Sequence, residues 1–295
     1  KQLGLMAELA CETSWDFVAS NIQRVEGEIH AQCQELGRVQ TPRLVAVSKT
    51  KPNEAILSAY AAGYRAFGEN YVQEILEKAK TLPSDIAWHF IGHVQSNKAR
   101  ALVEGVPSLF MVETVDSAKL ASKLNAACVS LGRLPLGVLV QVNTSGESSK
   151  SGVDPGEAAV DLARHVVQTC PGLKLCGLMT IGRYGDTTPE CFRCLEDCRT
   201  EVASELGIAG QDLELSMGMS SDYAVAIECG STNVRVGSSI FGVRDYSNKT
   251  PPVSTKEIQS APPAQSEPNA EDAKQAEDEV DRSNGHAATG SVLSV

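Results

Sequence analysis

From position 43 onward, short apolar runs alternate with amphipathic segments in a regular order. Eight runs have the length and composition of buried strands, rich in Val, Ile, Leu and Phe. They are RLVAVSKT (43–50), RAFGEN (65–70), IAWHFIG (86–92), LFMVET (109–114), LGVLVQVNT (136–144), LKLCGLMTIG (173–182), LELSMGM (213–219) and NVRVGSSIFG (233–242). The segments between them carry apolar residues at helical spacing, and several begin near Pro, Asp or Ser and end in Gly. Residues 1–38 show the same spacing, so a helix is expected before the first strand.

This order of elements predicts a (β/α)8 barrel, the TIM-barrel architecture, over residues 41–246. Eight β segments and seven helical connections are the parts that such a barrel needs. An open doubly wound sheet is the alternative, and it often has a Gly-rich first turn. The first turn here, SKTKPNEA, contains no glycine, so the barrel is favoured. Residues 1–40 then form an added helical segment that packs on the barrel.

The composition changes at residue 247. Residues 247–295 are rich in Pro, Ala, Ser, Glu and Asp and have almost no large apolar residues. Such a segment cannot bury enough apolar surface to offset the entropy that ordering costs. We therefore expect a disordered acidic tail, either dispensable or a docking segment for a partner.

The net charge of −11 is spread unevenly over the 295 residues. The tail has four basic and eight acidic residues, so it alone supplies −4. An acidic chain without a basic cluster argues against nucleic acid or anionic membrane as a partner. No apolar run approaches the roughly 20 residues that cross a bilayer. We expect a cytoplasmic protein, with a mitochondrial pool as the alternative.

The nine cysteines fit reduced thiols in an intracellular protein better than a disulfide framework. Three of them, Cys191, Cys194 and Cys198, form a C-x2-C-x3-C run that could suggest a metal or iron–sulfur site. However, the segment is predicted to be a helix, and these cysteines share one stripe with Val202. Because free cysteine packs as a small hydrophobe, core packing is the favoured interpretation.

Candidate chemistry is expected at the carboxyl ends of the strands, where barrel active sites lie and where phosphate is often bound after strands 7 and 8. The runs SMGMSSD and NVRVGSSIFG bring Ser216, Gly237 and Ser238 to that end. Small residues and hydroxyls allow backbone N–H groups to approach an anion closely. They predict a phosphate site, although Gly237 and Ser238 would equally serve to turn the chain at the barrel rim.

Lys49 lies at the end of the first predicted strand. Strand alternation places it on the same face as Val45 and Val47, so it points into the barrel mouth if the valines fill the interior. A lysine among apolar neighbours has a depressed pKa and forms Schiff bases readily. Lys51 lies past the strand and is expected to be solvated. The competing interpretation of Lys49 is a salt bridge to a strand-end acid such as Glu69.

A Schiff-base lysine together with a phosphate site suggests pyridoxal 5′-phosphate (PLP), whose ring nitrogen then needs a partner. Arg235 is two residues before Gly237 and on the same face, which places it near such a ring.

Seven motifs, in order over residues 40–245, resemble those of the pyridoxal phosphate homeostasis protein family. They are AVSKTKP, FGENYVQE, WHFIGHVQSNK, VQVNTSGESSKSG, GLMTIG, LSMGMSSD and GSTNVRVGSSIFG. The later phrase GVRDYSNK is similar to the animal members. The resemblance implies the barrel of the alanine racemase N-terminal domain, with PLP as cofactor.

Carried over by motif, the resemblance implies that Lys49 is the Schiff-base lysine and that Asn70 lines the cofactor. Arg235 is expected to face the pyridine nitrogen. The phosphate is expected at Ser216, Gly237 and Ser238; the last position is often threonine in the family, and serine keeps the hydroxyl. His93, in the matching IGHVQSNK segment, is expected to be a rim residue.

Two functions from different classes fit such a site: a PLP-dependent amino-acid racemase, and a non-catalytic carrier that holds, supplies or buffers PLP. Alanine racemases follow the barrel with a β domain that supplies a catalytic tyrosine, whereas only the predicted tail follows residue 247 here. An arginine at the pyridine nitrogen stays charged and weakens the ring as an electron sink, a feature that racemases share. The family is likewise regarded as having no established activity, so the carrier is favoured.

A class I aldolase-type barrel would also combine a lysine with a phosphate site, but such enzymes usually carry the lysine on a later strand. For the carrier we expect PLP as ligand and apo PLP-dependent enzymes as recipients. A monomer is the expected state, and pairing through the N-terminal helix is the alternative.

Overall fold

The computed structural model describes residues 15–183, 185 and 188–243. The tail predicted over 247–295, the first part of the 1–40 segment and most of the GVRDYSNK phrase lie outside the described residues.

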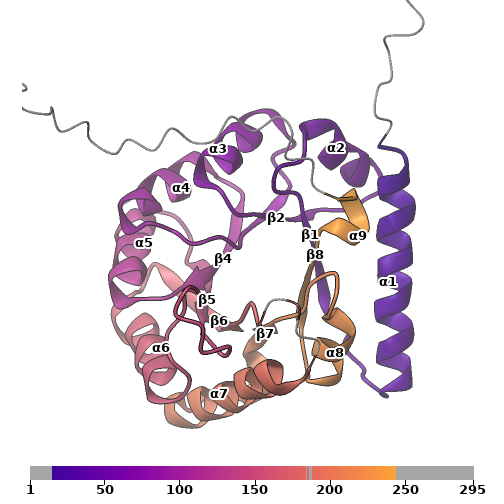
Figure 1. Cartoon of the computed structure of the whole chain (residues 1–295). Helices are drawn as coiled ribbons and strands as arrows, with labels where there is room; N and C mark the ends of the chain where they lie inside the picture. The colour runs from indigo at the N-terminus through magenta and orange to yellow at the C-terminus, as the bar shows by residue number, and fades with distance from the viewer. Residues whose placement is uncertain (1–14, 184, 186–187, 244–295) are drawn as a thin grey trace, which may run out of the picture. The chain divides into compact units, whose positions relative to one another are not determined.

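Eight parallel strands close into a barrel in which each strand pairs with the next along the chain and β8 pairs with β1 (Figure 1). The strands are β1 (Arg43–Val47), β2 (Ala66–Glu69), β3 (Ala87–Phe90), β4 (Leu109–Val115), β5 (Leu136–Gln141), β6 (Leu173–Met179), β7 (Glu214–Ser216) and β8 (Asn233–Val236). Every predicted strand is present, and the predicted barrel is confirmed.

Helices surround the barrel as an outer ring (Figure 1). Those that alternate with the strands in the described part of the chain are α2 (Asn53–Ala61), α3 (Val72–Thr81), α4 (Ala99–Gly105), α5 (Ala118–Ser130), α6 (Glu157–Thr169), α7 (Glu190–Leu206) and α8 (Tyr223–Glu228). Two 3₁₀ turns, η1 (Ser96–Lys98) and η2 (Gly210–Asp212), precede α4 and β7. None of the described helices is long and apolar enough to cross a membrane.

The strands separate two buried regions because successive side chains point to opposite faces. Outward residues such as Leu44 and Ala46 join the main core between strands and helices. Val45 and Val47 face inward, where they lie beside Gly68 of β2. A smaller apolar cluster of Met111, Leu139 and Met179 also stands apart from the main core. The strands are therefore buried on both sides, as parallel sheets require.

The first described helix, α1 (Phe17–Glu35), confirms the helix predicted before the barrel. It contacts α2, α8 and the one-turn helix α9 (Ser238–Phe241). Its buried stripe consists of Val18, Ile22, Val25, Ile29 and Cys33, at helical spacing. Two polar side chains add to this packing: Asn21 donates to the Ile240 carbonyl (3.0 Å) and Arg24 to the Ser239 carbonyl (3.1 Å).

The cysteines of α7 pack as predicted. Cys191 and Cys198 are buried, and Cys198 lies with Val202 in the main core. Burial is the largest influence on the thiols of Cys194 and Cys198 and raises the pKa of both. Protonated thiols on a packed stripe are side chains of the core.

Several predicted strands extend too far at their carboxyl ends, and two of these, the first and the eighth, carry predicted functional residues. β1 stops at Val47, and residues 48–51 form a turn in which Lys51 N–H donates to the Ser48 carbonyl (3.0 Å). β8 stops at Val236, and Ser238 begins α9. The predicted functional residues Lys49, Gly237 and Ser238 therefore lie just beyond the strands, on the turns.

Candidate functional site

The six predicted site residues come from one continuous arc of the barrel. Strands β7, β8, β1 and β2 are neighbours in that order. Their carboxyl ends contribute, in the same order, Ser216, Arg235 with Gly237 and Ser238, Lys49, and Asn70. The residues form two levels: Ser216 and Arg235 are buried, whereas the other four are partly or fully exposed at the rim.

Lys49 is half-buried in the turn that follows β1. Strand alternation stops at Val47, so it does not by itself set the direction of Lys49. The side chain of the neighbouring Lys51 makes two contacts. Its Nζ donates to the Val243 carbonyl (3.0 Å) and lies 5.8 Å from the Trp15 ring centroid. Lys51 thus contacts Val243 and Trp15, and it is not simply solvated as predicted.

Glu69, the competing partner proposed for Lys49, is fully buried and accepts hydrogen bonds from Lys78 Nζ (2.7 Å) and Ser48 Oγ (2.7 Å). Lys78 therefore supplies the positive charge opposite the Glu69 carboxylate. Lys78 lies in α3 and is itself 5% exposed.

Arg235 lies inside the barrel, level with Val45 of β1. Its Nη1 donates to Ser216 Oγ (2.6 Å) and its Nη2 to the Thr180 carbonyl (2.8 Å). Burial lowers the pKa of Arg235, and Glu113 and Asp222 oppose this. A guanidinium keeps its proton at neutral pH even so. The interior of the barrel thus presents an oriented positive group directly below the rim.

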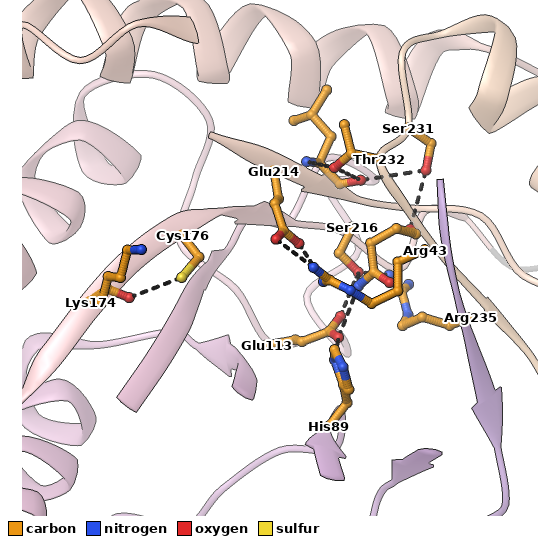
Figure 2. A network of polar contacts seen from close by, with 12 residues as sticks. Arg43, His89, Glu113, Lys174, Cys176, Glu214, Ser216, Ser231, Thr232 and Arg235 are labelled. Atoms are coloured by element: carbon orange, nitrogen blue, oxygen red, sulfur yellow. Dashed lines mark hydrogen bonds and ion pairs between the residues drawn. The ribbon is translucent and has the colours of Figure 1, made fainter. Parts of the chain in front are cut away.

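Glu113 supplies the main opposing charge. Its carboxylate accepts from Ser216 Oγ, from Asn233 Nδ2 (3.0 Å) and from His89 Nδ1, which lies 2.6 Å away (Figure 2). Burial acts to raise the pKa of Glu113, but the His89 contacts, the charge of Arg235 and the Ser216 hydrogen bond outweigh it and lower the pKa to about 2. We call His89, Glu113, Ser216, Asn233 and Arg235 the interior network; all five are buried.

Ser216, predicted to hold phosphate, is part of this network. Its hydroxyl contacts Arg235, Glu113 and Asn233 (3.1 Å from Nδ2). To bind a phosphate, this hydroxyl would have to give up one of these partners. Its phosphate role stays a prediction, and its present contacts orient Arg235.

The turn after β8 is shaped by close backbone packing. A Cβ on Gly237 would lie 3.3 Å from the Val47 carbonyl oxygen and 3.4 Å from Val47 Cβ, so β8 can approach β1 closely at the rim. The Gly237 N–H donates to Ser220 Oγ (3.2 Å) from the loop after β7. Ser238 is exposed beside it. Loops after strands 7 and 8 therefore meet, as a phosphate site in a barrel requires.

Asn70 follows β2 and packs against Gly92, where a Cβ would lie only 2.0 Å from the Asn70 carbonyl oxygen. His93, next to Gly92, is exposed and contacts Asp116 (3.0 Å) and Ser151 (3.2 Å). It is a rim residue, as predicted.

Buried polar atoms without a protein partner gather at this part of the rim. Among the described residues they include Thr50 Oγ1, Glu69 Oε2 and Asn70 Oδ1, all at the ends of β1 and β2 and close to Lys49 in sequence or pairing. Buried polar atoms are normally satisfied, and unsatisfied ones often mark a missing ligand or water. The polar atoms present at this rim fit a small polar ligand.

Four buried polar residues of the two clusters around this site were not predicted from the sequence: His89, Glu113, Asn233 and Lys78. The first three have a detectable signal, since each is a polar residue inside an otherwise apolar strand. Lys78 has none, because it is spaced like an ordinary exposed i, i+4 partner of Glu74.

Comparison with known proteins identifies the class first. The model of the family "alanine racemase, N-terminal domain" matches residues 26–245. Alanine racemase from Clostridium difficile is 16% identical, with a TM-score of 0.59, over 79% of this chain and 60% of the racemase; this likeness shows the fold alone.

Closer relatives identify the particular family. The human pyridoxal phosphate homeostasis protein is 48% identical over 240 residues, which are 78% of this chain and 86% of the human one. The Haemophilus influenzae protein of the same name is 44% identical over 78% of this chain and 97% of its own. The chain belongs to the pyridoxal phosphate homeostasis protein family, as its motifs predicted.

A solved relative carries the cofactor. The structure of PipY from Synechococcus elongatus with PLP bound is 34% identical, with a TM-score of 0.61. The match covers 76% of this chain and 100% of PipY.

Proposed function

We propose that this chain binds PLP as a Schiff base on Lys49 and holds it for supply to other proteins, without turnover of its own. The observation that carries the proposal is the rim between β8, β1 and β2, where a lysine, unpartnered buried polar atoms and a close-packed glycine turn lie above a buried arginine. PLP supplies an aldehyde that a primary amine captures reversibly, with loss of one water.

Each remaining group of the cofactor has a proposed partner in the chain. Arg235 lies below the rim and faces the ring nitrogen, held there by Ser216 and Thr180. The Gly237 and Ser238 turn binds the phosphate, which Ser216 joins by exchanging its contact with Glu113 or Asn233 for a phosphate oxygen. Asn70 lines the ring. One chain provides all six residues, so a monomer suffices.

The carrier is favoured over a racemase by the extent of the similarity. The matched region accounts for all of PipY and 97% of the Haemophilus influenzae relative, but for only 60% of the Clostridium difficile racemase. The relatives that match over most of their length are named for homeostasis.

A transfer experiment tests supply. The chain is loaded with PLP and mixed with an apo PLP-dependent enzyme, and recovery of enzyme activity is compared with PLP release into a buffer that contains a carbonyl trap. Delivery predicts recovery faster than release, whereas passive storage predicts equal rates. Racemisation of L-alanine that Lys49→Ala abolishes would overturn the carrier assignment.

A further inference from the structure

Thr50, the residue after Lys49, has an unusual backbone. Among the described residues it alone is a non-glycine with positive φ, at +64°. Left-handed φ is unfavourable for a β-branched residue and persists only where surrounding contacts impose it. One such contact is clear: the Thr50 N–H donates to Glu74 Oε1 of α3 (2.6 Å).

The residue before Lys49 is held from the same helix. Lys78 Nζ donates to the Ser48 carbonyl (2.9 Å), to Glu69 Oε1 (2.7 Å) and to Glu74 Oε1 (2.7 Å). An ammonium has three N–H donors, and these contacts use all of them. We call Ser48, Glu69, Glu74 and Lys78 the rim cluster.

Glu69 completes the cluster from the end of β2. It accepts from Ser48 Oγ (2.7 Å) while the Ser48 N–H donates to the Gly68 carbonyl (3.0 Å). The backbone on both sides of Lys49 is therefore tied down, at Ser48 N–H, Ser48 C=O and Thr50 N–H. These contacts come from two elements, β2 and α3.

Stability alone is a poor explanation for such a cluster. Burying ions is expensive, and apolar residues of similar volume often stabilise a fold equally well or better. Lys78 is 5% exposed and Glu69 is fully buried, so the desolvation cost applies. A well-packed apolar cluster could not form hydrogen bonds with the polar backbone atoms that flank Lys49.

We propose that the rim cluster positions Lys49 for the capture of PLP, with Glu74 and Lys78 as positioning residues. Glu74 imposes the left-handed conformation at Thr50, and Lys78 anchors the other side of the turn. This inference rests on the proposed role of Lys49.

The test uses Glu74, because its side chain is partly exposed and its replacement spares the buried charges of Glu69 and Lys78. Glu74→Ala removes the acceptor for Thr50 N–H; we expect PLP affinity to fall roughly tenfold or more. Borohydride labelling should then spread from Lys49 to Lys51.

Two further variants test the cause of this loss. Glu74→Gln keeps an acceptor oxygen and should lose less affinity. Adding Thr50→Gly to Glu74→Ala should recover part of the affinity, because glycine adopts positive φ without side-chain strain.

Glu77→Ala is the matched control, since Glu77 lies on the same helix and makes only exposed contacts with Lys80 (2.9 Å) and Gln73 (3.1 Å). It should leave both affinity and labelling unchanged. If Glu74→Ala binds PLP like the wild type and labels Lys49 alone, the positioning role is wrong. A loss of affinity that Thr50→Gly does not relieve also overturns it. If the wild type is not labelled at Lys49, the proposed function is wrong, and so is this inference, which rests on it.

Discussion

Two buried polar clusters lie close to the same proposed cofactor, and they are built differently. The interior network joins side chains of β3, β4, β7 and β8 to one another across the barrel, with Glu113 at its centre. The rim cluster joins side chains of β2 and α3 to the backbone of one turn, with Lys78 at its centre. The first cluster orients a charged side chain, and the second sets the conformation of a loop.

The difference extends to electrostatics. In the interior network one carboxylate faces Arg235 and His89, so its charged form is favoured and the pKa of Glu113 falls to about 2. In the rim cluster two carboxylates share one ammonium; burial raises the pKa of Glu69, with Glu74 adding to the rise and Lys78 opposing it. A buried acid is thus stabilised as an ion in one place and destabilised as an ion in the other.

The largest expected effect comes from breaking the interior network. Glu113→Gln leaves the Arg235 charge buried without its main counter-ion, and we expect unfolding free energy to fall by roughly 3–5 kcal/mol. Glu214→Gln is the comparison variant, because it breaks the partly exposed Arg43–Glu214 pair (2.7 Å), which joins the first residues of β1 and β7 (Figure 2). That change should cost about 1 kcal/mol or less. Urea unfolding measures both, and equal losses would contradict the account.

The contributions of the two clusters to unfolding free energy should change with pH in opposite directions. Glu113 binds its proton more weakly in the folded state, so its contribution is present above pH 4.5 and disappears as pH falls toward 2, a change of roughly 3 kcal/mol. Glu69 binds its proton more tightly in the folded state, so its contribution grows as pH falls toward 4.5. The stability difference between wild type and Glu113→Gln should shrink on acidification. The stability difference between wild type and Glu69→Gln should increase on acidification. If the two differences change with pH in the same direction, the electrostatic distinction between the two clusters is wrong.

The smallest effect concerns Thr50. Thr50→Gly removes the cost of left-handed φ and a buried hydroxyl oxygen without a partner. We expect a gain of about 1 kcal/mol in unfolding free energy, since strain relief exceeds the entropy cost of glycine. Thermal unfolding of Thr50→Gly against Thr81→Gly, an exposed threonine at the end of α3, tests this. A loss of stability at Thr50 equal to that at Thr81 would show that the turn is unstrained.

Much of the fold could be predicted because apolar periodicity reports burial directly. All eight strands and the seven helices between them follow that pattern in the described residues. The strand ends could not be predicted, since β1 stops where the backbone bonds Glu74 in α3, far along the chain. Ser48 and Lys49 look like strand residues until that contact is known.

The candidate site was predictable only in part, for a related reason. Lys49, Asn70, Gly237 and Ser238 lie at strand ends, and barrel topology alone gathers such positions. The depth of Ser216 and its contact with Arg235 depend on register between β7 and β8, where Ser216 pairs with Asn233. No local pattern specifies that register. Lys78 is the extreme case, because its sequence neighbours predict an exposed helix face while its side chain is buried.

The most direct test of the account is the site of covalent capture. The chain is incubated with PLP and reduced with borohydride, which converts the C=N bond to a stable C–N bond, and the modified peptide is identified by mass spectrometry. We predict one modification, on Lys49, that persists in Lys51→Ala and is lost in Lys49→Ala. Modification of Lys51 or another lysine with Lys49 unmodified, or no modification of the wild type, would contradict the central claim.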